Sequence, residues 1–127
     1  MPLNDDLSQV VPQIQSHFGQ DWVTEGVLIN PVTDALFADT GELVAGWYDF
    51  TIIYASDVAG KYPRLEHRNA ANTANVHDTV LSVFAHDVCL LYINNWRMET
   101  DERMRMICVA DQTGTTQGTI IWTKRMI

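Results

Sequence analysis

The sequence predicts an α+β fold in which one N-terminal helix packs on a mainly antiparallel β-sheet. Two observations support this prediction. In the first 20 residues, apolar side chains recur at spacings of three and four, as on one face of an amphipathic helix. From Glu25 onward they occur in short runs separated by turn-forming residues, as in a sheet. The 127 residues, 46% of them hydrophobic, are enough for one core, and we expect a single domain over residues 1–127.

The predicted helix occupies the start of the chain. Asn4 or Ser8 is a suitable N-cap, and Gly19 is a natural end. Pro12 fits the first turn of a helix that starts near Ser8, or kinks a longer helix that starts near Asn4, and the sequence leaves both open. The apolar face of this helix consists of Leu7, Val10, Val11, Ile14 and Phe18.

The segments that follow are short and separated by turn chemistry. Residues 27–29, between Gly26 and Pro31, predict a strand. The Asp-Thr-Gly run at residues 39–41 separates two apolar runs and predicts a hairpin turn.

Residues 46–55 are compatible with two structures. Their β-branched and aromatic side chains favour a strand, yet Trp47, Phe50 and Tyr54 would also share one face of a helix. Residues 56–75 contain glycine, proline and a run of small polar residues, and they predict a loop or a short edge strand.

The last fifty residues predict an antiparallel meander. Its strands cover residues 79–84, 88–96, 103–109 and 119–126. Turns centred on Thr100 and Gly114 set a register in which Trp96 lies opposite Met104 and Met106 opposite Trp122. One face of the meander then collects Leu90, Tyr92, Asn94, Trp96, Met104, Met106, Cys108, Ile120 and Trp122.

That face suits either a plain core or the lining of a small-molecule cavity. It is apolar and aromatic, with a single amide that must find a hydrogen-bond partner if it is buried. The binding hypothesis assigns an apolar ligand to Tyr92, Asn94, Trp96, Met106 and Trp122.

Three further residues are candidates for catalysis. Asp49 lies among apolar residues, where a carboxylate can become a proton acceptor, unless it simply points to solvent. His67 carries an imidazole, the side chain best suited to acid–base work near neutral pH, although an exposed loop histidine fits the same sequence. Tyr54 can donate to a ligand oxygen or merely bury its ring.

Composition excludes several function classes. With 8 Lys and Arg against 16 Asp and Glu, the net charge of -8 repels phosphate backbones and anionic lipid, so we expect neither nucleic acid nor membrane as a partner. Cys89 and Cys108 lie in apolar runs and predict reduced, structural thiols. We expect no metal and no cofactor, because metal-ligand spacings and glycine-rich phosphate loops are absent from the sequence. The start of the chain lacks an export signal, which predicts a cytoplasmic protein.

Three stretches resemble the nuclear transport factor 2-like superfamily, which includes ketosteroid isomerase-like and SnoaL-like proteins. They are the helical pattern through Phe18, the run 27–29 followed by 37–47, and residues 78–91 together with 118–125. The resemblance implies a strongly bent sheet that encloses a cone-shaped cavity. It also implies a helix over residues 46–55 and a homodimer formed through the outer face of the sheet.

These observations lead to three expectations. The main one is a protein that binds a small apolar molecule in the cavity and, if it is an enzyme, performs isomerisation, cyclisation or dehydration by proton transfer. The alternative is a non-catalytic ligand-binding or protein-interaction module whose cavity is filled by its own side chains. A closed all-β barrel with one helix follows if residues 46–55 form a strand.

Overall fold

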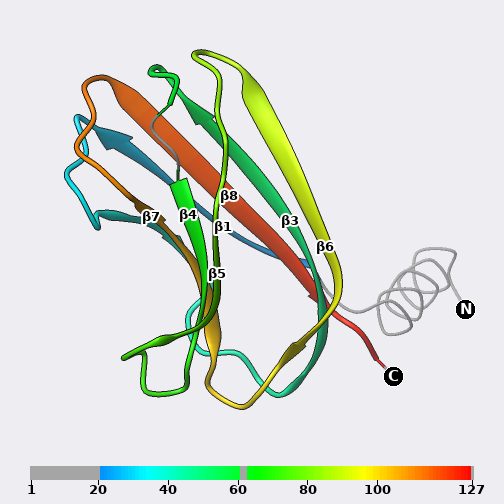
Figure 1. Ribbon diagram of the computed structural model, residues 1–127. Coiled ribbons are helices and arrows are strands. Elements are labelled where there is room, and N and C mark those ends of the chain that lie inside the picture. The colour runs from blue at the N-terminus through cyan, green and yellow to red at the C-terminus, as the bar shows by residue number, and fades with distance from the viewer. Residues whose placement is uncertain (1–20, 61–62, 127) are drawn as a thin grey trace, which may run out of the picture.

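The computed structural model describes residues 21–60 and 63–126, which form two antiparallel four-stranded sheets packed face to face (Figure 1). Sheet A has the strand order β1-β8-β3-β6, and sheet B has the order β2-β7-β4-β5. The strands are β1 (Asp21–Ile29), β2 (Leu36–Asp39), β3 (Gly46–Ser56), β4 (Pro63–Arg68), β5 (Asn75–Val80), β6 (Val88–Met98), β7 (Arg103–Cys108) and β8 (Thr115–Lys124).

The predicted α+β fold with a cone-shaped cavity is wrong. Residues 21–60 and 63–126 contain strands, turns and loops and no helix, so this part of the chain is a β-sandwich. The predicted N-terminal helix falls within residues 1–20, outside the described residues. Residues 46–55 belong to β3, a central strand that pairs with both β6 and β8. The all-β alternative was therefore closer, although the sheets form two layers and not a closed barrel.

The predicted meander is also wrong, because β5, β6, β7 and β8 alternate between the two sheets. β6 pairs with β3, β7 pairs with β2 and β4, and β8 pairs with β1 and β3. The segment at residues 99–102 is tied to the β2–β3 loop: the Leu43 amide donates to the Glu102 carbonyl over 2.9 Å, and the Asp101 amide donates to the Leu43 carbonyl over 2.8 Å. It thus connects the two layers of the sandwich and does not close a β6–β7 hairpin.

A β-bulge in β6 decides which side chains face the core. Asn94 and Asn95 together oppose Asp49, and Asn95 adopts a φ of 58°. The extra residue reverses the alternation along the strand. Before the bulge, Ile93 points inward and Tyr92 is 63% exposed, whereas after it the inward position is taken by Trp96. The predicted face of the meander therefore combined residues from both sides of sheet A with residues of β7 in sheet B.

The two sheets approach each other closely at a pair of glycines. Gly26 of β1 lies opposite Gly118 of β8, and Phe37 of β2 lies over both. A Cβ atom on Gly26 would lie 1.7 Å from the carbonyl oxygen of Phe37, and a Cβ atom on Gly118 would lie 2.3 Å from its ring. A side chain at either position would therefore separate β2 from sheet A.

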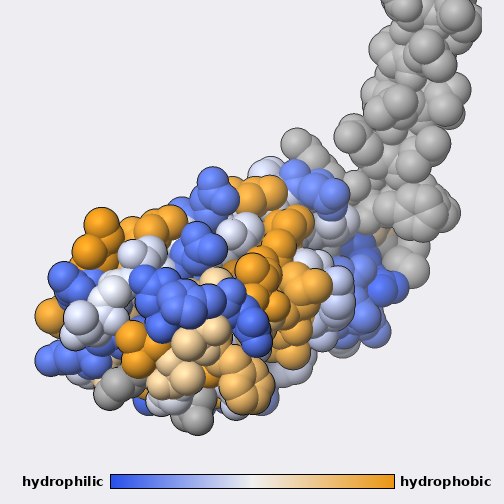
Figure 2. Space-filling model, turned by 90° about the horizontal axis from the view of Figure 1, so that it is seen from above, coloured by the Kyte–Doolittle hydropathy of each residue, from blue (hydrophilic) through white to orange (hydrophobic). Residues whose placement is uncertain are grey.

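The outer faces of the sheets differ in polarity. Sheet B carries ion pairs, including Arg105 Nε with the buried Glu66 Oε1 at 2.6 Å and Arg103 with Asp39 at 3.3 Å. Sheet A carries exposed aliphatic side chains on β1 and β6. Seen from the end of the sandwich that is uppermost in Figure 1, hydrophobic residues also lie on the surface among hydrophilic ones (Figure 2). Phe84, in the β5–β6 loop at this end, is among the exposed ones.

Candidate functional site

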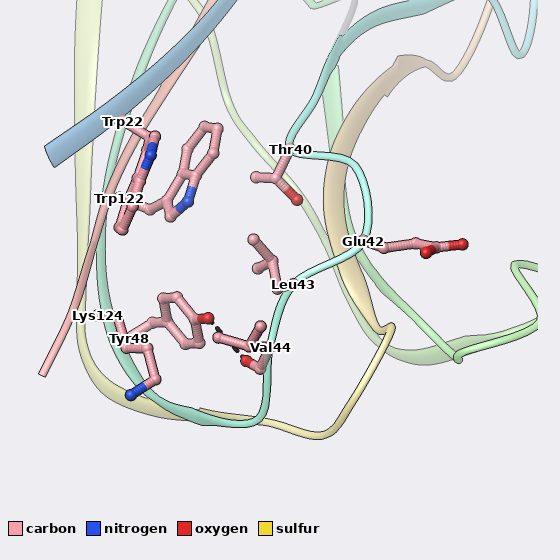
Figure 3. A pocket seen from close by; sticks show the side chains of 8 residues that line it. All are labelled: Trp22, Thr40, Glu42, Leu43, Val44, Tyr48, Trp122 and Lys124. Atoms are coloured by element: carbon pink, nitrogen blue, oxygen red, sulfur yellow. Dashed lines mark hydrogen bonds between the residues drawn. The ribbon is translucent and has the colours of Figure 1, made fainter. Parts of the chain in front are cut away.

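An open pocket of about 290 Å³ lies between sheet A and the β2–β3 loop, toward the end of the sandwich that is lower in Figure 1. Figure 3 shows it from close by. Its back wall comes from β1, β3 and β8, and its front wall comes from the loop. We call it the tryptophan pocket. Its lining consists of Trp22, Thr40, Glu42, Leu43, Val44, Tyr48, Trp122 and Lys124.

Two indoles form the back wall of the tryptophan pocket. Trp22 and Trp122 are cross-strand partners on β1 and β8, and their rings stack with centroids 6.3 Å apart and an interplanar angle of 20°. Trp122 is packed into the core and only 8% exposed, whereas Trp22, on the edge strand, is 40% exposed. The pair therefore offers a flat aromatic surface that is anchored on one side and open to solvent on the other.

Hydrogen bonds hold the front wall in place. The Tyr48 hydroxyl donates to the Val44 carbonyl over 2.7 Å, and the Gly41 amide donates to Asp39 Oδ1 over 2.7 Å. Burial raises the pKa of the Tyr48 hydroxyl. In Figure 3 the Glu42 side chain points away from the two indoles.

The polar groups left free in the tryptophan pocket are donors. Lys124 pairs with no carboxylate of residues 21–60 and 63–126, and neither indole N–H has a hydrogen-bond partner in that part of the chain. A ligand with several oxygen acceptors and an apolar face fits these groups best.

A second cavity, of about 380 Å³, opens on the side of the sandwich where β5 and β6 are the edge strands. Its floor is aliphatic and its walls are aromatic. We call it the histidine pocket. Its lining consists of Leu65, His67, His77, Asp78, Thr79, Leu81, Leu91, Ile93, Trp96 and Met104.

A chain of hydrogen bonds fixes one wall of the histidine pocket. Trp96 Nε1 donates to His67 Nδ1 over 3.0 Å, so the ring proton of a neutral His67 is on Nε2, which lies 2.9 Å from Glu102 Oε1. The same carboxylate oxygen accepts the Glu99 amide over 2.6 Å. His67 is buried. The ring of His77 meets the ring of Trp96 edge-on, with the ring centroids 5.1 Å apart.

Glu102 makes this chain of hydrogen bonds sensitive to acid. Burial raises the pKa of its carboxyl, but hydrogen bonds from the Glu99 amide and His67 and the nearby histidines lower it by more, so that this pKa lies below its ordinary value of 4.5. A carboxyl whose pKa is lowered by folding stabilises the fold above its unfolded pKa, and that stabilisation is lost as the pH falls through the folded pKa.

We therefore expect Glu102→Gln to destabilise the protein by about 1–3 kcal/mol at neutral pH, the range for losing a charged partner of buried donors. The difference from the wild type should shrink as the pH falls below 4.5, because the wild-type carboxyl then also becomes neutral. Urea unfolding of both proteins at several pH values between about 5 and 3 measures this difference. A difference that stays constant over that range would contradict the role given to the carboxylate.

The structure distributes the predicted ligand-binding residues over several regions. Trp96 lies in the histidine pocket, Trp122 in the tryptophan pocket, and Met106 is fully buried in the core. Tyr92 and Asn94 are exposed on β6. The predicted set therefore does not form one site.

The three predicted catalytic residues lie in different environments. Asp49 faces outward on sheet A, where Oδ1 accepts the Asn95 amide over 2.8 Å and lies 3.1 Å from Arg125 Nε. Tyr54 is buried on the other side of β3, and burial followed by the nearby Cys89 raises the pKa of its hydroxyl. His67 lies on β4 and is not a loop residue. The structure joins it to Trp96 but not to Asp49 or Tyr54.

The sequence did not predict a site role for Trp22, Lys124 or His77. Trp22 precedes the apolar run that predicted the first strand, and only the pairing of β1 with β8 brings it to Trp122. Similarly, His77 reaches His67 because β5 pairs with β4, and β4 lies within residues 56–75, which were predicted as a loop or a short edge strand. The alternation of apolar and polar residues around each tryptophan indicates a strand, but it does not identify the strand with which it pairs.

Two kinds of feature are absent from residues 21–60 and 63–126. No group of three or more His, Cys, Asp or Glu side chains is arranged to hold a metal ion there. The same residues include no helix of the length and hydropathy that a membrane crossing requires.

No family model and no curated protein matches the chain. Among solved structures, the C-terminal family 22 carbohydrate binding module of Clostridium thermocellum Xyn10B is similar, with 16% identity, a TM-score of 0.50, and coverage of 84% of this chain and 82% of that chain. A carbohydrate binding module from Cellvibrio mixtus lichenase 5A, solved with cellotriose, has 10% identity, a TM-score of 0.49, and coverage of 85% and 92%. A family two carbohydrate esterase from Cellvibrio japonicus has 11% identity and a TM-score of 0.48, with coverage of 87% of this chain and 32% of the esterase.

These comparisons correct the expected family. At 16% identity, the likeness to the family 22 module shows a shared β-sandwich fold and nothing more. The resemblance to the nuclear transport factor 2-like superfamily was wrong, since the described residues form neither its helices nor its cone. The expected isomerase, cyclase or dehydratase activity required that cone, so this expectation is wrong as well. The non-catalytic ligand-binding alternative agrees better with the structure.

Proposed function

We propose that this protein is a carbohydrate-binding module that holds a sugar in the tryptophan pocket. The observation that carries the proposal is the stacked pair Trp22–Trp122 in an open pocket whose free polar groups, among the described residues, are the indole N–H donors and Lys124. The fold is of the kind found in a module described as binding carbohydrate, which supports the same conclusion.

The chemistry of a sugar matches this arrangement. One face of a pyranose ring presents C–H groups and packs on an aromatic ring, and the hydroxyls around its rim need hydrogen-bond partners. Trp22 offers the accessible ring face, while Lys124 and the indole N–H groups offer donors. A volume of about 290 Å³ is at the lower end of ligand pockets and suits one or two sugar units.

Affinity electrophoresis through a panel of soluble polysaccharides, followed by calorimetry with oligosaccharides from any polymer that binds, tests the proposal. We expect retardation in at least one gel, with serum albumin as the unretarded control. Because the pocket is small, Kd should become constant at the disaccharide, with no further gain for longer chains. Absence of retardation across neutral and acidic polymers would overturn the proposal.

We also propose a homodimer formed through the outer face of sheet A. Exposed apolar side chains on an outer sheet face favour association, and this face carries Val23, Val27 and Ile29 on one edge strand and Leu90 and Tyr92 on the other. Sedimentation velocity should show a dimer for the full chain at tens of micromolar and a monomer for Leu90→Lys, in which a charge lies within the contact. A wild-type monomer at that concentration would exclude this interface.

A further inference from the structure

We propose that the histidine pocket is a second binding site and that its ligand is an uncharged, planar ring compound of about two fused rings. This site lies on the side of the sandwich bounded by β5 and β6, away from the tryptophan pocket on β1 and the β2–β3 loop. Ligand binding at this site does not depend on sugar binding in the tryptophan pocket.

The shape of the cavity indicates the size of the ligand. A dry cavity of about 150 Å³ lined by aliphatic side chains is known to bind benzene. The histidine pocket measures about 380 Å³ and has an aliphatic floor that includes Leu65, Leu91 and Met104. The edge-on rings of Trp96 and His77 form a wall against which a flat molecule packs.

The charges around the cavity indicate that the ligand is neutral. The carboxylate of Glu102 is occupied by His67 and the Glu99 amide. Asp78 alternates with the inward-facing His77 and Thr79, and its Oδ2 accepts the side-chain amide of Asn75, which also donates to Glu66. Both carboxylates are therefore engaged, and the lining within residues 21–60 and 63–126 holds no Lys or Arg, so a charged ligand would be desolvated without compensation.

The histidine pocket can also form a hydrogen bond with one polar group of the ligand. The Thr79 hydroxyl and the His77 ring line the cavity, and neither is engaged in a hydrogen bond within the described residues. Trp96, in contrast, is held by His67, so this wall is ordered before a ligand arrives. Such pre-organisation lowers the entropic cost of binding.

Three probes of the same ring and different charge test the proposal: indole, indole-3-acetate and tryptamine. Titration of the isotope-labelled full chain, followed by NMR at pH 7.5, should show indole shifting the Trp96 Nε1–H and Met104 methyl signals. We expect indole to bind at least tenfold more tightly than either charged analogue. Equal affinities for all three, or shifts that leave Trp96 and Met104 unchanged, would overturn the proposal.

Two variants connect the signal to the cavity. Leu91→Trp fills the floor and should weaken indole binding at least tenfold, whereas Val80→Trp, on the exposed side of β5, should leave it unchanged. If Leu91→Trp does not fold, Thr79→Val decides, because it replaces the hydroxyl with a methyl group of similar size and should weaken binding by roughly threefold or more. Indole binding that is unaffected by Thr79→Val and by a folded Leu91→Trp would place the ligand elsewhere.

Discussion

Trp22→Ala should abolish the retention of the protein by its polysaccharide, with a loss of affinity of ten- to a hundredfold, or about 1.4–2.7 kcal/mol. The reason is that Trp22 supplies the exposed ring face of the tryptophan pocket. Its removal leaves Trp122, which is buried in the core and presents little surface to a ligand. Affinity electrophoresis and calorimetry on the oligosaccharide of the polymer that binds measure the loss.

The chain offers a matched control for this substitution. Trp47 is 41% exposed against 40% for Trp22, and it lies on β3 beneath the guanidinium of Arg97, outside the pocket lining. Trp47→Ala should therefore retain full binding. The tryptophan pocket is the wrong site if both variants bind like the wild type, or if Trp47→Ala loses the polysaccharide and Trp22→Ala retains it.

Gly26→Ala should have the largest effect on stability, with a loss of more than about 4 kcal/mol, which is exceptional for one methyl group. The added Cβ atom would lie 1.7 Å from the backbone carbonyl oxygen of Phe37. A backbone atom cannot rotate away as a side chain can, so β2 must move from sheet A and expose the core around Phe37. Urea unfolding followed by circular dichroism, or the absence of folded protein, reports the effect.

Gly60→Asn is the control for this experiment. Gly60 has a φ of 80°, which asparagine tolerates better than most residues, and a Cβ atom there would meet nothing within 4 Å. Its substitution should cost less than about 1 kcal/mol. A folded Gly26→Ala protein with a stability within that same margin would mean that the two sheets are not held at this glycine pair.

Local patterns in the sequence predicted strands better than they predicted their partners. Residues 27–29 and 103–109 were assigned to strands; the first run lies in β1, and β7 covers the second except for its last residue. The turn at residues 39–41 also exists, with a positive φ at Gly41, but it leads from one sheet to the other and does not close a hairpin. Alternation and turn residues are local properties, whereas pairing depends on contacts between distant segments. A sequence with these patterns therefore fits a meander and a sandwich equally well.

The candidate site was predictable only in part. His67 and Trp96 were singled out, and the structure joins them by a hydrogen bond, although in an arrangement the sequence did not predict. A single bulge at Asn94–Asn95 puts Tyr92 and Trp96 on opposite faces of sheet A, because one extra residue reverses the direction of every later side chain. Neither a bulge nor a cross-strand partner leaves a clear local signal, which is why Trp22 was missed.

The pairing of β1 with β8 also has a consequence for the order of folding. β1 pairs only with β8 among the described strands, so the segment that carries Trp22 is held in the sheet by residues from the other end of the chain. Closing so long a loop is slow and costs entropy, which places sandwiches of this kind among slow-folding proteins. The two indoles meet only when that closure is complete. A partly folded chain, even one in which β3 and β6 are already paired, has no tryptophan pocket and would be separated from the native protein by a polysaccharide column.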